Sequence, residues 1–134
     1  MIILDENFPE SQRQLLRGWS VRIRQIGYEV GRKGMQDDEI IPFLLRRRRS
    51  TFFTLDLGFY QRRLCHDRYS LVCMDVGQYE AAAFVRRLLR YKPFNTEAKR
   101  MATVLRVSHR GLVVWRLRAE REAHFEWSQL SQRR

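Results

Sequence analysis

The sequence predicts one α/β domain of three layers, in which a mostly parallel central sheet ends in a C-terminal β-hairpin. The short apolar runs Met1–Leu4, Thr51–Leu55 and Ser70–Met74 are typical of strands covered on both faces, as in parallel sheets. Met101–Val107 and Leu112–Leu117 alternate around a short turn, which predicts the hairpin. The domain is therefore expected to cover residues 1–117, followed by a charged tail over residues 118–134.

The segment after the first strand is expected to contain a helix and then an edge strand. Apolar residues recur at helical spacing within Phe8–Trp19. Asn7 is a suitable N-cap for this helix, and Pro9 fits its first turn, where a missing N–H costs little. Val21–Ile26 partly alternates with polar residues, which predicts a strand with one exposed face. A later amphipathic helix is predicted over Tyr79–Tyr91.

Another helix is predicted to begin in the acidic stretch Asp37–Glu39 and to end in four consecutive arginines. Acidic residues are favourable at a helix start, and an apolar stripe follows them. Pro42 fits best if this helix begins close to Glu39, because deeper in a helix proline removes a backbone hydrogen bond. The final arginines suit the negative helix end but are more than a cap requires.

The chain is strongly basic, and its basic residues are almost all arginines. The net charge is +11, and only three of the 26 basic residues are lysines. Arginine forks onto phosphate oxygens and stacks on bases, so a nucleic-acid partner is the first interpretation. The densest block supplies the candidate nucleic-acid-binding residues Arg46, Arg47, Arg48 and Arg49. A solvated helix end or an acidic protein partner is the alternative.

Acidic residues stand where the predicted strands end. Asp5 follows the first strand, Asp56 and Asp75 follow the next two buried strands, and Asp37 and Asp38 stand at a helix start. The carboxyl ends of parallel strands share one rim of a sheet, where ligands bind. Several carboxylates there repel one another unless a hard divalent cation, Mg²⁺ or Mn²⁺, lies between them. Such a cation can activate water against a phosphodiester.

The candidate site is defined by four of these acids. Asp5, Asp37, Asp38 and Asp56 are the candidate catalytic residues, and Asp5, Asp37 and Asp56 are the expected metal ligands. The alternative for each acid taken alone is a purely local role, because aspartates cap loops and helices. Glu6 is expected to be a supporting or surface group.

Other features bound the class of protein. The two cysteines and the opening on Met1 without a secretory leader predict a reduced, cytoplasmic protein. No apolar run approaches the ~20 residues that span a bilayer, so no membrane partner is expected. The histidines lack partners at metal-ligand spacing and are expected at the surface. Ala123, Trp127 and Leu130 lie at helical spacing, so the tail is expected to be either a docking helix or a frayed terminus.

Three motifs together resemble a known family. The stretches LDEN at Leu4–Asn7, DDEII at Asp37–Ile41 and TLDLGF at Thr54–Phe59 resemble the PIN-like domain, in particular a small bacterial group that opens with LDENLP. The resemblance covers roughly residues 1 to 75 by motif, and the rest of the chain only by the order of its elements.

The resemblance implies a PIN-like fold and an endoribonuclease that depends on Mg²⁺ or Mn²⁺. It also implies a VapC-like toxin whose partners are RNA and an antitoxin protein. Asp5 corresponds to the first acid of the family, the acids at Asp37–Glu39 to the second, and Asp56 to the aspartate of the TLD motif. The family commonly has another aspartate two residues after Asp56, where this chain has Gly58.

Two other function classes stay open. The departure at Gly58 is consistent with a non-catalytic PIN-like module that binds RNA or a protein. A phosphoacceptor signalling domain also places acids after its first and third strands. That class needs a Ser or Thr after the fourth strand, where this chain has Asp75. The sequence leaves the oligomeric state open, a homodimer included.

Overall fold

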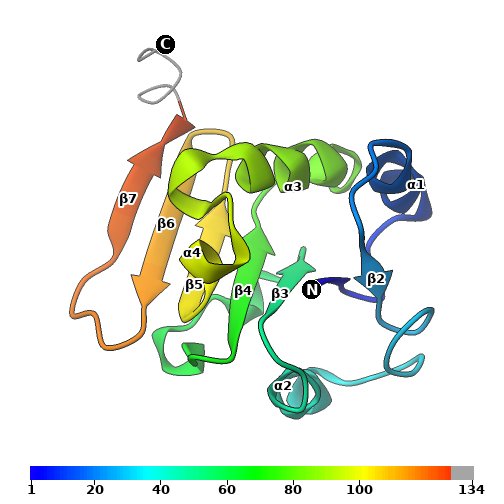
Figure 1. Cartoon of the computed structure of the whole chain (residues 1–134), viewed down its shortest axis with the longest axis horizontal. Coiled ribbons are helices and arrows are strands. Elements are labelled where there is room, and N and C mark those ends of the chain that lie inside the picture. Colours follow the sequence, from blue (N-terminus) through cyan, green and yellow to red (C-terminus); the bar gives the residue numbers. More distant parts are fainter. Residues whose placement is uncertain (128–134) are drawn as a thin grey trace.

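A single seven-stranded sheet organises the molecule (Figure 1). The computed structural model describes residues 1–127. The strand order is β2-β1-β3-β4-β5-β6-β7; β1 to β5 pair in parallel, and β6 and β7 are antiparallel to their neighbours. The strands are β1 Ile2–Leu4, β2 Arg24–Gln25, β3 Ser50–Thr54, β4 Tyr69–Met74, β5 Thr103–Val107, β6 Gly111–Arg116 and β7 Ala123–Glu126. The predicted α/β class and mostly parallel sheet are confirmed.

Helices cover both faces of the sheet, α1 and α3 on one side and α2 on the other (Figure 1). Successive residues of a strand point to opposite faces. Accordingly, Phe53 packs in the cluster that contains α1 and α3, while Phe52 packs in the cluster of α2. The helices are α1 Glu10–Gly18, α2 Asp37–Leu45, α3 Ala81–Arg90 and α4 Glu97–Arg100, with short 3₁₀ turns η1 Leu57–Phe59, η2 Arg62–Leu64, η3 Gln78–Glu80 and η4 Lys92–Phe94.

Two predicted details of the helix starts are wrong. Pro9, not Asn7, is the N-cap residue of α1, and Asn7 is exposed in the preceding loop. α2 begins at Asp37, so Pro42 lies in its interior rather than in its first turn. Pro42 therefore cannot donate to the carbonyl of Asp38, four residues earlier. The helix tolerates this loss because Pro42 lies on its exposed side.

The tail that the sequence assigned to residues 118–134 contributes a strand to the sheet. β7 pairs with β6 in antiparallel register, so the C-terminal hairpin is extended to three strands. The prediction of a helix over residues 123–126 is therefore wrong. The physical reason is a pattern of period two, in which Phe125 packs edge-to-face on Tyr91 and Phe94 while His124 and Glu126 are exposed. The predicted helical position Leu130 lies outside the described residues.

The predicted strand at Val21–Ile26 is shorter than expected. Only Arg24 and Gln25 form β2, which lies at one edge of the sheet beside β1, as predicted. Within residues 1–127, every helix is too short or too polar to cross a membrane.

Candidate metal centre

Asp5 and Asp56 meet at the carboxyl ends of β1 and β3 through the side chain of Thr54. β1 and β3 are parallel neighbours, with Leu4 opposite Phe53, so the residues that follow both strands reach the same rim. Thr54 Oγ1 donates a 2.6 Å hydrogen bond to Asp5 Oδ2 and accepts one of 3.0 Å from the backbone N–H of Asp56. Thr54 is fully buried, so this bridge is fixed. The sequence prediction did not include Thr54.

The N-terminus of α2 brings two further acids to the same rim. Asp37 and Asp38 line a pocket of about 500 Å³ together with Asp56. Apolar and polar residues of α2, η1 and η2 complete the wall: Ile41, Gly58, Phe59, Gln61, Arg63 and Leu64. Asp38 also lines a second pocket on the other flank of α2. The structure thus gathers all four candidate acids in one region.

The carboxylates influence one another electrostatically. Burial raises the pKa of Asp5 above its ordinary value, and the charges of Asp37 and Asp56 raise it further, although the hydrogen bond from Thr54 opposes this shift. Desolvation raises the pKa of Asp37, and the nearby carboxylate of Asp56 adds to this rise by its charge and as a hydrogen-bond partner. Three segments far apart in the sequence therefore place interacting carboxylates at one point.

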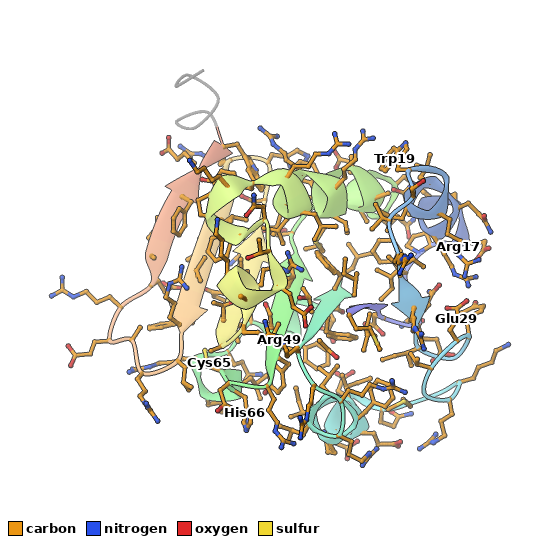
Figure 2. All side chains as sticks on the ribbon, viewed as in Figure 1. Arg17, Trp19, Glu29, Arg49, Cys65 and His66 are labelled. Carbon is orange, nitrogen blue, oxygen red and sulfur yellow. The ribbon has the colours of Figure 1, made fainter. Side chains whose placement is uncertain are left out.

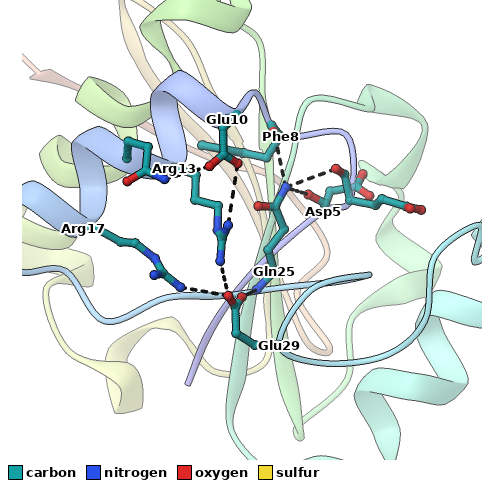
Figure 3. Close-up of polar contacts among 9 residues, drawn as sticks. Asp5, Phe8, Glu10, Arg13, Arg17, Gln25 and Glu29 are labelled. Atoms are coloured by element: carbon teal, nitrogen blue, oxygen red, sulfur yellow. Dashed lines mark hydrogen bonds and ion pairs between the residues drawn. The ribbon is translucent and has the colours of Figure 1, made fainter.

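The loop that carries Asp5 is held by Gln25 (Figure 3). Gln25 Nε2 lies 3.0, 3.1 and 3.0 Å from the backbone carbonyl oxygens of Asp5, Glu6 and Phe8, so its two N–H groups are shared among these three acceptors. Its side chain is 1% exposed, so these bonds are shielded from water. The edge strand β2 therefore supports the candidate site, a role that the sequence did not indicate.

Glu29 fixes the position of Gln25 in turn. Glu29 Oε1 accepts a 2.8 Å hydrogen bond from the backbone N–H of Gln25, and Glu29 Oε2 pairs with Arg13 and with Arg17 (Figure 3). Burial of the Glu29 carboxyl is outweighed by these hydrogen bonds and guanidinium charges, so the pKa of Glu29 is lowered. This ion-pair group thus includes Arg13, which is buried, and Arg17, which is exposed.

Gly58 is explained by its contact with Asp56. The backbone N–H of Gly58 donates a 2.8 Å hydrogen bond to Asp56 Oδ1, which caps η1. A Cβ at position 58 would stand 2.9 Å from this oxygen, so a side chain there would crowd the carboxylate. Asp56 therefore has the local capping role that was the alternative interpretation, in addition to its place beside Asp37.

The four arginines that follow α2 are separated from Asp5 and Asp56 by the length of β3. They precede β3, whereas Asp56 follows it, so they occupy the opposite rim of the sheet; Arg49 marks this end in Figure 2. Arg49 pairs with Glu97 at 3.3 Å, and Arg47 stacks over the ring of Phe43. Arg46 and Arg48 are exposed, and Arg46 lines the second pocket beside α2. Arg46 therefore shares a pocket with Asp38, whereas the arginine block as a whole lies at the other rim from Asp5 and Asp56.

The remaining polar candidates have local partners. Asp75 pairs with Arg106 at 2.8 Å, and Glu6 Oε1 accepts a 2.8 Å hydrogen bond from the backbone N–H of Gly34. His66 and His109 pair with Asp67 and Glu80, and His124 is exposed. Both cysteines are free thiols, and burial raises the pKa of Cys73 to about 12.

The acids are close without forming a ready set of metal ligands. Within residues 1–127, no three His, Cys, Asp or Glu side chains are arranged so that they could already hold a metal ion. The donor chemistry nevertheless fits a hard cation, because carboxylate oxygens are the ligands that Mg²⁺ and Mn²⁺ prefer. Binding would require the exposed side chains of Asp37 and Asp56 to turn toward Asp5.

No family model, curated protein or solved structure matches this chain significantly.

Proposed function

We propose that this protein is an endoribonuclease of the PIN-like type that uses Mg²⁺ or Mn²⁺. The observation that supports this proposal is the proximity of Asp5, Asp37 and Asp56: desolvation is the main cause that raises the pKa of Asp5 and Asp37, and the charges of the neighbouring carboxylates raise both further. Uncompensated carboxylates at one rim destabilise a fold, so their convergence suggests a site that gains a cation in its working state.

In this proposal Asp5, Asp37 and Asp56 hold the ion, with Asp38 as an acid of the same pocket. The bound ion would supply an activated water and would offset negative charge on the scissile phosphate. Thr54 and Gln25 would keep Asp5 in place, because the first bonds its carboxylate and the second its backbone. The net charge of +11 favours attraction of RNA.

The direct test is cleavage of a labelled single-stranded RNA in the presence of Mn²⁺. We expect cleavage by the natural chain and loss of cleavage in Asp5→Asn and Asp56→Asn, which keep the shape of the side chain without its charge. Asp67→Asn is the matched control, because Asp67 is exposed and precedes β4, at the opposite rim. Equal activity in Asp5→Asn and the natural chain would rule out the proposed site.

Metal binding can be measured without a substrate. A ligand that binds only the folded state stabilises it by about 2.7 kcal/mol when its concentration is 100 times its dissociation constant. Mg²⁺ should therefore raise the melting temperature of the natural chain and of Asp67→Asn, but not that of Asp5→Asn. A similar shift in all three proteins would place the cation elsewhere.

A second candidate is a non-catalytic PIN-like module that binds RNA. It is favoured by Gly58, which replaces an acid that the family commonly has, and by the lack of a ready set of metal ligands in the described part of the chain. This candidate predicts RNA binding that weakens steeply with salt, with no turnover. The resemblance further predicts an antitoxin partner, which a small open reading frame overlapping this gene would support.

A further inference from the structure

Arg63 stands in the same pocket as three of the acids. It is an exposed residue of η2 and lines the pocket together with Asp37, Asp38 and Asp56. Across residues 1–127, Arg63 forms no ion pair with a carboxylate. Its guanidinium therefore has charge available for a ligand.

Two other arginines on this side of the sheet are already paired with acids. Arg32 pairs with Glu39 on α2, and Arg106 pairs with Asp75 at 2.8 Å. Each of these guanidinium groups is therefore neutralised by a carboxylate of the protein. Arg63 differs from both, because within residues 1–127 it lines the pocket of the acids and has no carboxylate partner.

A short series of hydrogen bonds connects Arg63 to Asp56 and sets its orientation. The backbone N–H of Gly58 donates to Asp56 Oδ1, and Gln61 Nε2 donates to the carbonyl of Gly58 at 2.6 Å. Arg63 Nε then donates to Gln61 Oε1 at 2.7 Å. The bond at Nε restricts the guanidinium plane and leaves both terminal amino groups, Nη1 and Nη2, for a ligand.

We propose that Arg63 is a positioning residue that binds a phosphate of the RNA backbone beside the acids. The proposal rests on the proposed function in its choice of RNA, and its own support is a guanidinium that is oriented by one hydrogen bond and has no carboxylate partner within residues 1–127. Two parallel N–H donors match the oxygens of a phosphodiester. The pocket wall at Gly58 carries no side chain, so the space between Asp56 and Arg63 is not blocked there.

The charges of the pocket agree with a phosphate ligand. Three carboxylates and one guanidinium line the pocket, which leaves an excess of negative charge that one divalent cation would balance. A phosphodiester bound there would then be attracted both by the divalent cation and by the guanidinium of Arg63. The acids alone would repel the same phosphate, so Arg63 gives the anion a fixed contact in an otherwise acidic pocket.

The test is RNA binding measured by fluorescence anisotropy with a labelled single-stranded RNA over a range of salt concentrations, with Ca²⁺ at a fixed concentration as a divalent cation that carboxylate oxygens bind. We expect Arg63→Gln to weaken binding and to reduce the slope of log affinity against log salt by about 1, the loss of one phosphate contact. Arg90→Gln is the matched control, because it removes the same charge from an exposed position of α3, on the opposite face of the sheet. It should leave this slope unchanged.

Arg63→Lys separates charge from geometry. Lysine keeps the charge but cannot donate two parallel hydrogen bonds, so the salt slope should return while the affinity is only partly restored. Equal affinities and slopes for Arg63→Gln and Arg90→Gln would overturn the proposal. The anisotropy measurement requires no cleavage, so it tests the role of Arg63 independently of the proposed nuclease activity. If the natural chain never cleaves RNA, the nuclease proposal is refuted, and the phosphate contact of Arg63 is still decided by the binding data.

Discussion

Thr54 and Asp5 are joined by a 2.6 Å hydrogen bond from Oγ1 to Oδ2, across the carboxyl ends of two neighbouring strands. The same hydroxyl oxygen accepts the backbone N–H of Asp56 at 3.0 Å. One buried side chain thus sets the separation of two acids that lie far apart in the sequence. The candidate site depends on this residue as much as on the carboxylates.

Thr54→Val should test this dependence. Valine has nearly the same shape but leaves Asp5 without its donor and the N–H of Asp56 without its acceptor. We expect a loss of about 1–3 kcal/mol in the free energy of unfolding, measured in urea. The pKa of Asp5 should rise further, because a hydrogen bond that favours its charged form is gone. Thr54→Ser keeps the hydroxyl, so the pKa of Asp5, measured by NMR titration, should stay unchanged in this control. An unchanged pKa of Asp5 in Thr54→Val would contradict the hydrogen-bonded bridge.

Asp37→Asn should stabilise the protein at neutral pH. Desolvation and the carboxylate of Asp56 raise the pKa of Asp37 above the unfolded value, which is about 3.9. Between these two pKa values the folded state binds more protons than the unfolded state, so the stability falls as the pH rises through this window. The penalty is fully present above the folded pKa and absent below the unfolded one. Removing the charge removes the penalty.

The measurement is the free energy of unfolding in urea at several pH values. The advantage of Asp37→Asn over the natural chain should be present at neutral pH and should disappear in acid. Asp67→Asn should show no such advantage, because the partner of Asp67 is His66 rather than another acid. A variant Asp37→Asn that is less stable than the natural chain at neutral pH would show that Asp37 is held by favourable contacts.

Gln25→Leu should loosen the loop that carries Asp5. The substitution removes the donor of three carbonyls, of which that of Phe8 is bonded in a buried position. Each buried acceptor left without a partner costs about 1–3 kcal/mol, so a loss of at least this size is expected in urea unfolding. Gln14→Leu is the control, since the side chain of Gln14 is exposed and donates a hydrogen bond to the carboxylate of Glu10. Equal losses in the two variants would show that Gln25 does not support the loop.

The sequence predicted the part of the fold that follows from local patterns. The runs that became β1, β3 and β4 are mostly apolar or β-branched and carry no charged residue, because helices cover both faces of the sheet. The acids at their ends could be identified because parallel strands share one rim. The motifs also placed Asp37 correctly, since an acidic stretch marks a helix start.

The parts that were missed depend on contacts between distant segments. Gln25 lies in a two-residue strand, and its three acceptors belong to a loop about 20 positions away, so no local pattern indicates its role. Thr54 was visible as a strand residue and as the first residue of the TLD motif, but neither pattern indicated that it bridges Asp5 and Asp56. The polar end of an otherwise apolar strand, two positions before Asp56, was the signal that could have identified it.

The distribution of the arginines was also beyond a local interpretation. A run such as Arg46–Arg49 is visible in the sequence, but its position on the opposite rim follows from the direction of α2 relative to the sheet. Arg63 has no basic run around it beyond Arg62, and only the fold places it in the acidic pocket. Charge composition therefore predicts that the partner is anionic, but it does not predict which residues bind that partner.

Gly111→Ala tests β7, the strand that the structure shows where the sequence predicted a docking helix or a frayed terminus. Gly111 begins β6 opposite Glu126 of β7, and a Cβ there would overlap the backbone carbonyl of Phe125. The neighbouring backbone would have to move, so we expect a loss of about 1–3 kcal/mol in urea unfolding, the usual cost of overpacking. Detachment of β7 should also speed proteolytic cleavage between β6 and β7, followed by mass spectrometry.

Gly18→Ala is the control for this substitution. Gly18 ends α1 and would place a Cβ where no atom lies within 4 Å, so alanine should be neutral or stabilising by up to about 1 kcal/mol. The difference between the two variants isolates the close approach of β6 and β7 from the general effect of replacing glycine. If Gly111→Ala were as stable and as resistant to protease as Gly18→Ala, residues 123–126 would not be paired with β6, and the sheet would end at β6 as the sequence predicted.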